Sequence, residues 1–264
     1  MKILFDNILK TKQILSVNAS ASYPARNLTD NFLRLRYQVN TTSDSLTILL
    51  GETVTIDCLY MGYIGNLNDI KVSFFSGGVV LAVVFDSQHI AEPGVLRIFE
   101  TGVLAMFGGG PQDYFADYGQ QEFTSRHFTP ITGVDEIRID YTGTNPFFVG
   151  GLAAGLCTDM PPAIVQWEDS YRDNSVVTTS AQGQILPQYI EPLKQFVFTF
   201  ESVSYSEFLA LKEKFRSVGP KPVWVTFFED SEDDYPPGYY QVEMRGQQRD
   251  RLTYTFSVTF TEAR

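Results

Sequence analysis

The segment 112–118 combines the two residue types that sugar-binding sites use. Tyr114 and Tyr118 offer flat apolar rings, and Asp113 and Asp117 offer carboxylates that accept hydrogen bonds. An aromatic platform holds one face of a sugar ring while a few polar groups fix its orientation. A second interpretation is a loop tip whose rings pack on the edge of a sheet or on a neighbouring subunit. We take the four residues as candidate carbohydrate-binding residues.

Other reactive side chains give weaker patterns. Cys58 and Cys157 are the two cysteines of the chain, and either a disulfide or two buried thiols acting as small hydrophobic residues fits them. Together with His89 and His127 they show no metal-ligand spacing, so no structural zinc site is expected. The acidic run 229–234 lacks the alternating spacing of an EF-hand, which favours a solvated hairpin tip over a weak cation site.

The sequence carries no recognisable catalytic or cofactor motif. It has no G-x-S-x-G elbow, no Walker loop, no G-x-G-x-x-G that opens a helix and no H-E-x-x-H. The glycine run 108–110 leads into Pro111 rather than a lysine or a helix start, which favours a loop over a phosphate cradle. We therefore predict a protein that is not an enzyme and holds no cofactor or metal ion. A glycan hydrolase would need two carboxylates in a cleft, and no motif nominates a pair.

The composition of the 264-residue chain limits its partners. Hydrophobic residues make up 44% of it, enough for a buried core, which excludes intrinsic disorder. The net charge of −11 repels nucleic-acid phosphates and anionic lipid. No apolar stretch approaches the roughly 20 residues of a membrane span, and no targeting segment is visible. We expect synthesis in a cytoplasm, without nucleic-acid binding or membrane insertion.

Short strands separated by turns are predicted for the first 160 residues. Residues 54–58 alternate apolar and polar side chains, with Val54, Ile56 and Cys58 on one face, as in a half-buried strand. Glycines follow several apolar runs at hairpin spacing. The pattern is typical of a jelly-roll-like β-sandwich. The predicted strands are 46–50, 54–58, 71–75, 79–85, 95–99, 103–107 and 136–141.

The two prolines at 161–162 mark the boundary between the predicted domains 1–160 and 161–264. After them the residue pattern predicts a helix as well as strands. A helix is predicted at about 204–217, because Ser204 and Glu207 form a capping box and Gly219 ends it. Its apolar stripe is Tyr205, Phe208, Leu209, Leu211 and Phe215. Strands are predicted at 196–200, 223–228, 239–244 and 252–260. The second domain is therefore a small antiparallel β domain with one packed helix.

The final strand, 252–260, alternates large apolar residues with hydroxyl residues and contains neither proline nor lysine. Such a strand is an unguarded edge unless something pairs with it. A closed ring of subunits would satisfy that edge by symmetry. We therefore take Thr253, Thr255 and Ser257 as candidate residues of an assembly interface.

Residues 19–30, Ala-Ser-Ala-Ser-Tyr-Pro-Ala-Arg-Asn-Leu-Thr-Asp, resemble the opening of galactose-binding-like (discoidin-type) β-sandwiches. Residues 134–143 and 148–155 resemble the closing strands of that family, so the resemblance spans roughly residues 15–158. Tyr37 stands where the family usually has a tryptophan. The resemblance implies a jelly-roll scaffold and, as partner, a glycan on a host surface.

The second half resembles tail proteins of long-tailed bacteriophages. The shared order is the Ser-x-x-Gly-Gln stretch 180–184, an aromatic strand, a capped helix, Gly219, a proline-led strand and the final strand. The resemblance implies a structural component of a tail tip or baseplate, like distal-tail and minor tail proteins. Its C-terminal domain would form a homo-oligomeric ring contacting tube and hub proteins in the virion tail, and its N-terminal sandwich would decorate the ring or contact host glycan. The alternatives are a carbohydrate-binding module outside a phage tail and a glycan hydrolase.

Overall fold

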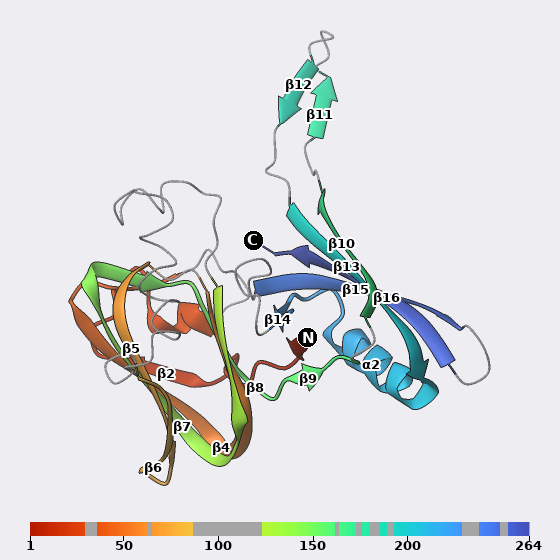
Figure 1. The fold of residues 1–264 in the computed structure, drawn as a ribbon. Coiled ribbons are helices and arrows are strands. Elements are labelled where there is room, and N and C mark those ends of the chain that lie inside the picture. Colours follow the sequence, from red (N-terminus) through yellow and green to blue (C-terminus); the bar gives the residue numbers. More distant parts are fainter. Residues whose placement is uncertain are drawn as a thin grey trace. The chain divides into compact units, whose positions relative to one another are not determined.

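The structure is a computed structural model of the chain. It describes residues 1–29, 36–62, 65–86, 123–161, 164–172, 176–179, 185–188, 193–228, 238–248 and 253–263. The chain divides into two compact units (Figure 1). Unit 1 comprises Met1–Phe5, Thr158–Val225 and Gly238–Arg264, and unit 2 comprises Asp6–Cys157 and Thr226–Pro237. Antiparallel strands dominate both units, which confirms the predicted mainly β fold class.

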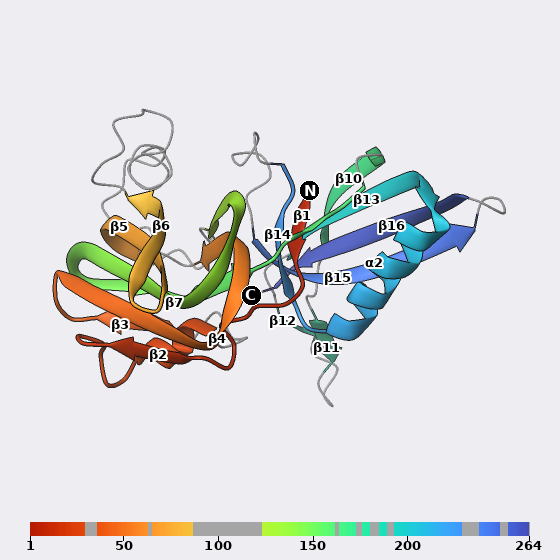
Figure 2. The same cartoon turned by 90° about the horizontal axis from the view of Figure 1, so that it is seen from below.

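Unit 2 is a β-sandwich built around two long, curled strands (Figures 1 and 2). Its elements are β2 (Gln13–Ser16), the 3-10 helix η1 (Ala25–Thr29), β3 (Tyr37–Val39), β4 (Ser43–Gly62), β5 (Gly65–Ser76), β6 (Val79–Asp86), β7 (Phe123–Val149) and β8 (Gly151–Gly155). The sheet order is β2-β4-β7-β5-β6, with β3 paired to β7 and β8 to β4. β4 pairs with the Phe123–Thr142 part of β7, from Ser43↔Thr142 to Gly62↔Phe123, with register shifts between Leu49 and Cys58. The predicted strands 46–50 and 54–58 are thus one strand.

The predicted hairpin between 71–75 and 79–85 is confirmed as β5 and β6. Gly77 and Gly78 form its turn, both with positive φ (56° and 81°), a backbone region that glycine enters without steric cost. The predicted hairpin of 95–99 and 103–107 lies outside the described residues.

Along β4 the core-facing positions change parity. Up to Ile56 they are even-numbered, whereas Leu59 and Met61 face the core beyond it. The ladder with β7 shifts register between Ile56 and Cys58, and the extra residues lie in β7, between Ile131 and His127. Cys58 and Tyr60 are fully buried but lie outside the core cluster. The predicted strand 54–58 is confirmed as part of β4, with Ile56 and Cys58 both fully buried.

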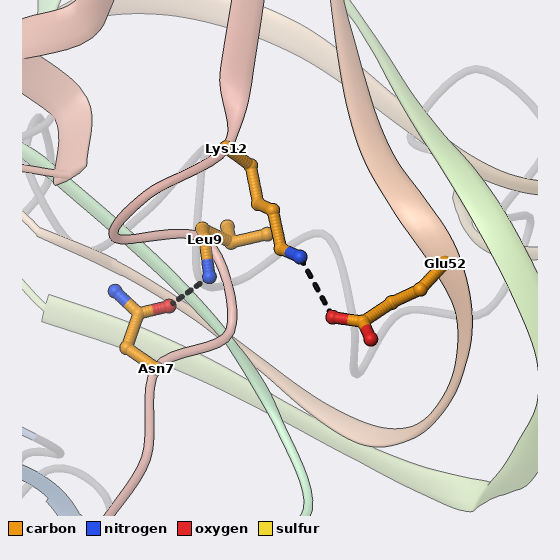
Figure 3. A network of polar contacts seen from close by, with 4 residues as sticks. All are labelled: Asn7, Leu9, Lys12 and Glu52. Carbon is orange, nitrogen blue, oxygen red and sulfur yellow. Dashed lines mark hydrogen bonds and ion pairs between the residues drawn. The ribbon is translucent and has the colours of Figure 1, made fainter.

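A buried asparagine fixes the chain that leads into the sandwich (Figure 3). Asn7 Oδ1 accepts hydrogen bonds from the backbone N–H groups of Leu9 and Ala154, at 3.1 and 3.2 Å. Its Nδ2 donates to the Leu152 carbonyl at 3.2 Å. The side chain thereby supplies three backbone groups of two separate segments with partners, which a buried backbone requires. Nearby, Lys12 and Glu52 form an ion pair at 2.8 Å.

Unit 1 contains a seven-stranded sheet with one helix on one face (Figure 2). Its elements are β1 (Lys2–Leu4), β9 (Thr158–Asp159), β10 (Ile164–Arg172), β13 (Leu193–Ser204), α2 (Tyr205–Val218), β14 (Val223–Thr226), β15 (Gly238–Gln248) and β16 (Thr253–Glu262). The strand order is β10-β13-β16-β15-β14-β1-β9. β11 (Val176–Thr179) and β12 (Ile185–Gln188) pair as a separate hairpin (Figure 1). The compact units differ from the predicted domains 1–160 and 161–264, because β1 joins the sheet of unit 1. That the two predicted ranges fold independently stays a prediction.

The predicted helix is confirmed, including both of its ends. The Ser204 side chain accepts a hydrogen bond from the Glu207 N–H, and the Glu207 carboxylate accepts one from the Ser204 N–H. Gly219 caps the C-terminus. Phe208 and Leu211 are buried against the sheet, whereas Leu209 of the predicted stripe is exposed. Tyr205 is exposed as well but stacks on Tyr254, and Phe215 packs edge-on against Phe5.

β16 is an interior strand of its sheet. Its backbone pairs with β13 on one side and β15 on the other, from Thr261 to Thr253. The expectation of an unguarded edge at 252–260 is therefore corrected: the domain supplies both ladders, because β13 inserts beside β16. The adjacent strand β15 is interior as well.

No helix among the described residues is long and apolar enough to cross a bilayer.

Candidate functional site

Several predicted features lie outside the described residues. These are the candidate sugar-binding residues Asp113, Tyr114, Asp117 and Tyr118, the glycine run 108–110, His89 and the acidic run 229–234. The assignment of a sugar site to the 112–118 loop stays a prediction.

A polar row lies along β3 and its flanks in unit 2. Tyr37 and Val39 are fully buried in the core cluster. Since successive side chains of a strand point to opposite faces, Arg36, Gln38 and Asn40 project away from the core. Arg36 and Gln38 are half-buried, and Asn40 is exposed.

Two aromatic rings flank this row. The Arg36 guanidinium carbon lies 5.2 Å from the ring centroid of Tyr23 and 4.7 Å from that of Phe148, within the range of cation–π attraction. Phe148 is opposite Gln38 in the β3–β7 ladder, so both side chains lie on one face. Tyr23 is 37% exposed. We name Tyr23, Arg36, Gln38, Asn40 and Phe148 the β3 patch.

The backbone holds the β3 patch in place. The Gln38 N–H donates to the Tyr23 carbonyl at 3.2 Å, and the Ser20 N–H donates to the Gln38 carbonyl at 2.8 Å. The Asn27 amide donates to the Arg36 carbonyl at 2.9 Å, and the Gln38 amide donates to Asn40 Oδ1 at 3.1 Å. An exposed aromatic edge from Tyr23 therefore lies beside the guanidinium and the two amides carried by β3 and its flanking residues.

The β3 patch is not among the sites predicted from the sequence. Its signal is the alternation of polar and apolar residues at 36–40, which marks Arg36, Gln38 and Asn40 as outward-facing. The sequence alone could not show that Tyr23 and Phe148 pack on either side of Arg36, because tertiary folding brings them together.

A second group of chemically active side chains surrounds the two cysteines of unit 2. One ligand atom each from Asp57, Cys58 and Cys157 lies within 4.8 Å of the others. Both cysteines are free thiols. Tyr60 Oη lies 3.6 Å from Cys157 Sγ, and His127 is opposite Cys58 in the β4–β7 ladder. We name these five residues the thiol cluster.

The two thiols of the cluster have opposite electrostatic surroundings. The Cys58 thiol donates to the Gly155 carbonyl at 3.3 Å, and its neighbour Cys157 together with burial raises the pKa of Cys58 well above its ordinary value. Hydrogen bonding from Cys58, with contributions from His127 and Tyr60, lowers the pKa of Cys157 to about 6, although burial opposes the shift. Of the two sulfurs, Cys157 is thus the nucleophilic one.

Around the cluster, Thr226 of the same unit links three side chains. Its hydroxyl oxygen lies within hydrogen-bond distance of His127 Nε2, Tyr60 Oη and Ser125 Oγ, at 2.9, 3.1 and 3.0 Å. These contacts orient the His127 ring and the Tyr60 hydroxyl.

The candidate interface residues Thr253, Thr255 and Ser257 lie on one face of β16 in unit 1. They are half-buried, and Ser257 shares a hydrogen bond of 3.0 Å with Thr199 on β13. Tyr254 and Phe256 alternate with them. Tyr254 stacks on Phe208 of α2, and the Phe256 ring lies tilted against Phe208. The hydroxyl row therefore lies on the sheet face opposite the helix.

No protein-family model matches the chain, and no curated protein does. Among solved structures, a carbohydrate-binding module (CBM32-1) from a family 31 glycoside hydrolase of Clostridium perfringens matches 58% of this chain and 99% of its own, with 14% identity and a TM-score of 0.40. The lectin domain of lectinolysin, solved with Lewis B antigen, matches 56% of this chain and 95% of its own, with 12% identity and a TM-score of 0.38.

A fucose-binding module of Streptococcus pneumoniae, SpX-3, matches 57% of this chain and 98% of its own, with 11% identity and a TM-score of 0.38. Likenesses at this level carry no conclusion about fold or ligand. The fold assignment therefore rests on the strand order of this chain, and the candidate sites rest on the distances and burial of their residues.

Proposed function

We propose that unit 2 is a non-catalytic carbohydrate-binding β-sandwich and that the β3 patch contacts the sugar. The observation that carries the proposal is the juxtaposition of the partly exposed Tyr23 ring with the Arg36 guanidinium and the amides of Gln38 and Asn40. An apolar surface beside a few fixed donors and acceptors is what a sugar ring requires.

The resemblance to galactose-binding-like sandwiches supports the same function. The segments that carry the resemblance meet in space: η1, from the opening motif, packs against β8 of the closing motif and against β3. Tyr23 and Asn27, both in the opening motif, contribute directly to the surroundings of Arg36. The resemblance and the candidate surface therefore involve the same residues.

The chemistry of the surface favours a neutral glycan. The chain carries a net charge of −11, which lowers the local concentration of anionic ligands such as sialylated or sulfated sugars. Within the patch, Tyr23 would offer its apolar ring, Gln38 and Asn40 would donate to and accept from hydroxyl groups, and Arg36 would donate to ring or hydroxyl oxygens.

A glycan array probed with the full-length protein tests this function, followed by calorimetric titration of the best ligand. We expect Tyr23→Ala to weaken binding at least about tenfold, which corresponds to about 1.4 kcal/mol. The matched control is Tyr171→Ala, because Tyr171 is a 71% exposed tyrosine of unit 1. A double Tyr114→Ala, Tyr118→Ala variant tests the predicted 112–118 loop separately.

The outcomes separate the location of the site from the function. Loss of binding in the loop variant with full retention in Tyr23→Ala would move the site from the β3 patch to the loop. The absence of binding by the wild-type protein to any glycan on the array would refute the carbohydrate-binding function.

We further propose that unit 1 is the assembly part of a phage tail tip or baseplate protein, located in the virion tail and made in the host cytoplasm. The supporting observation is the order β13, α2, β14, β15 and β16, with the capping box in place, which is the order behind the resemblance to tail proteins. The hydroxyl row of β16, on the face away from α2, would contact the next subunit of a ring or a tube or hub protein.

Light scattering after size-exclusion chromatography tests this assembly. We expect a closed oligomer, alone or with a partner tail protein, and its loss when Thr253, Thr255 and Ser257 are all changed to lysine, because three added charges on that face repel. Unchanged assembly of a folded triple-lysine variant would contradict an interface on this face of the sheet.

A further inference from the structure

The thiol cluster gathers metal-binding groups from parts of the chain that the sequence keeps far apart. We propose that Asp57, Cys58 and Cys157 form a binding site for Zn²⁺ or a similar thiophilic divalent ion, with the His127 imidazole as fourth ligand. The inference is independent of the proposed sugar binding. It also departs from the sequence-based expectation of no metal, which rested on the lack of closely spaced ligands.

The separation of the ligand atoms suits a tetrahedral ion. Zinc binds thiolate sulfur at about 2.3 Å and carboxylate oxygen at about 2.0–2.2 Å, so neighbouring ligand atoms around it lie roughly 3.5–3.8 Å apart. The three ligand atoms of Asp57, Cys58 and Cys157 already lie within 4.8 Å of one another. Side-chain movements on the order of 1 Å would bring them into the coordination range.

The fold builds this proximity through three features. Beyond Ile56, Leu59 and Met61 of β4 belong to the core cluster and Cys58 does not, and Cys58 neighbours Cys157. β8 pairs with β4 so that Gly155 lies opposite Cys58. The Cys157 N–H then donates to Asp57 Oδ1 at 2.8 Å, which holds the end of β8 against β4. Asp57 and Cys58 therefore lie on a strand, and the hydrogen bond to Asp57 fixes Cys157 in the short connection that follows β8.

His127 is the residue that we assign as fourth ligand, although its nitrogens lie outside the group of three ligand atoms within 4.8 Å. It stands opposite Cys58 in the ladder with β7. Its Nδ1 is buried and has no hydrogen-bond partner among the residues that the structure describes, whereas Nε2 is fixed by the Thr226 hydroxyl at 2.9 Å. An imidazole with one nitrogen held by a neighbouring group and the other without a partner matches the arrangement of metal-binding histidines.

The donor types decide which ions fit. Two thiolates select zinc and similar soft or borderline ions over calcium and magnesium, which require oxygen ligands. Two thiolates and one carboxylate carry three negative charges, and a divalent cation would leave one. Both sulfurs bind as thiolates, so any proton that a thiol still carries is displaced to solvent.

Titration of the full-length, reduced protein with Zn²⁺, and with Co²⁺ as a spectroscopic probe, tests the site. We expect one ion per chain and a thiolate-to-cobalt charge-transfer band. Because the chain has only two cysteines, such a band reports on Cys58 and Cys157 alone. We also expect Zn²⁺ to protect both thiols from alkylation in the wild-type protein, a readout that needs no variant.

Variants identify the ligands. Cys157→Ser and Cys58→Ser should abolish the band, and His127→Ala should weaken Zn²⁺ binding at least about tenfold. Glu52→Gln is the matched control for Asp57→Asn, because Glu52 is an exposed carboxylate of the same strand and its loss should leave binding unchanged. If Cys58→Ser fails to fold, Cys157→Ser and the protection experiment carry the test.

Three results would overturn the proposal. The first is a wild-type protein that binds neither ion. The second is binding that survives folded Cys157→Ser. The third is alkylation of the thiols at the same rate with and without Zn²⁺.

Discussion

The packing of Phe208 on the sheet of unit 1 gives a quantitative test of how α2 is held. Phe208 is 7% exposed, and its ring stacks on Tyr254 at a centroid distance of 4.6 Å and an interplanar angle of 13°. A buried phenylalanine removes about 150–200 Å² from water, worth about 4–5 kcal/mol at about 25 cal/mol per Å². We therefore expect Phe208→Ala to lower the free energy of unfolding of unit 1 by about 3–5 kcal/mol.

Gly246 on β15 provides a second test of the same packing, because it lies against the Phe208 ring. A Cβ at Gly246 would lie 2.6 Å from two ring atoms of Phe208, so Gly246→Ala should cost about 1–3 kcal/mol through overpacking. Once Phe208 is alanine, the clash disappears. The double variant should therefore be destabilised by clearly less than the sum of the single effects.

Urea unfolding followed by tryptophan fluorescence measures these effects. Both tryptophans of the chain, Trp167 and Trp224, belong to unit 1, so the signal reports on the unit that contains α2. Glu213→Ala, an exposed change on the same helix, is the control and should cost less than about 0.5 kcal/mol. Equal losses in Phe208→Ala and Glu213→Ala, or additive effects in the double variant, would refute this account of the packing.

Two further predictions concern hydrogen bonds. Asn7→Ala should destabilise unit 2 by about 2–4 kcal/mol in urea unfolding followed by circular dichroism, because three buried backbone groups lose their partner, whereas Lys12→Ala, at the ion pair of Figure 3, should have a much smaller effect. Hydrogen bonding to Ser204 lowers the pKa of the Glu207 carboxyl group. The ionised Glu207 therefore stabilises the fold above the ordinary glutamate pKa of about 4.3, and this stabilisation disappears as the pH falls through the lowered pKa. The stability difference between wild type and Glu207→Gln should therefore shrink on acidification, and a constant difference would contradict the capping role.

The helix ends and the hairpin turn could be predicted from the sequence, because each depends on residues that are close together in the chain. The capping box of Ser204 and Glu207 and the stop at Gly219 place α2 at 205–218, close to the expected 204–217. The glycine pair 77–78 placed the β5–β6 hairpin. These features depend on side chains that bond to backbone a few residues away, so the sequence contains all of the information that they need.

Strand order was not accessible in the same way. The alternation of 252–260 correctly predicts a strand with one apolar face, but it cannot tell whether the strand is interior. Both ladders of β16 come from β13 and β15, and the pairing with β13 spans the helix. The alternation of apolar and polar residues indicates which face of a strand is buried. Which strands pair with it on either side depends on the topology of the fold.

The thiol cluster escaped sequence reasoning for a related physical reason. Period-two alternation identifies Cys58 as a buried residue of a strand, but it cannot show that Cys157 and His127 lie beside it, because tertiary folding brings them together. An irregularity in a ladder cannot be recognised reliably from the sequence. It disrupts regular pairing locally, and such irregularities are frequent next to functional sites. The position of the β4–β7 register shift beside two thiols, a carboxylate and an imidazole is therefore itself a reason to test this point of the sandwich for metal binding.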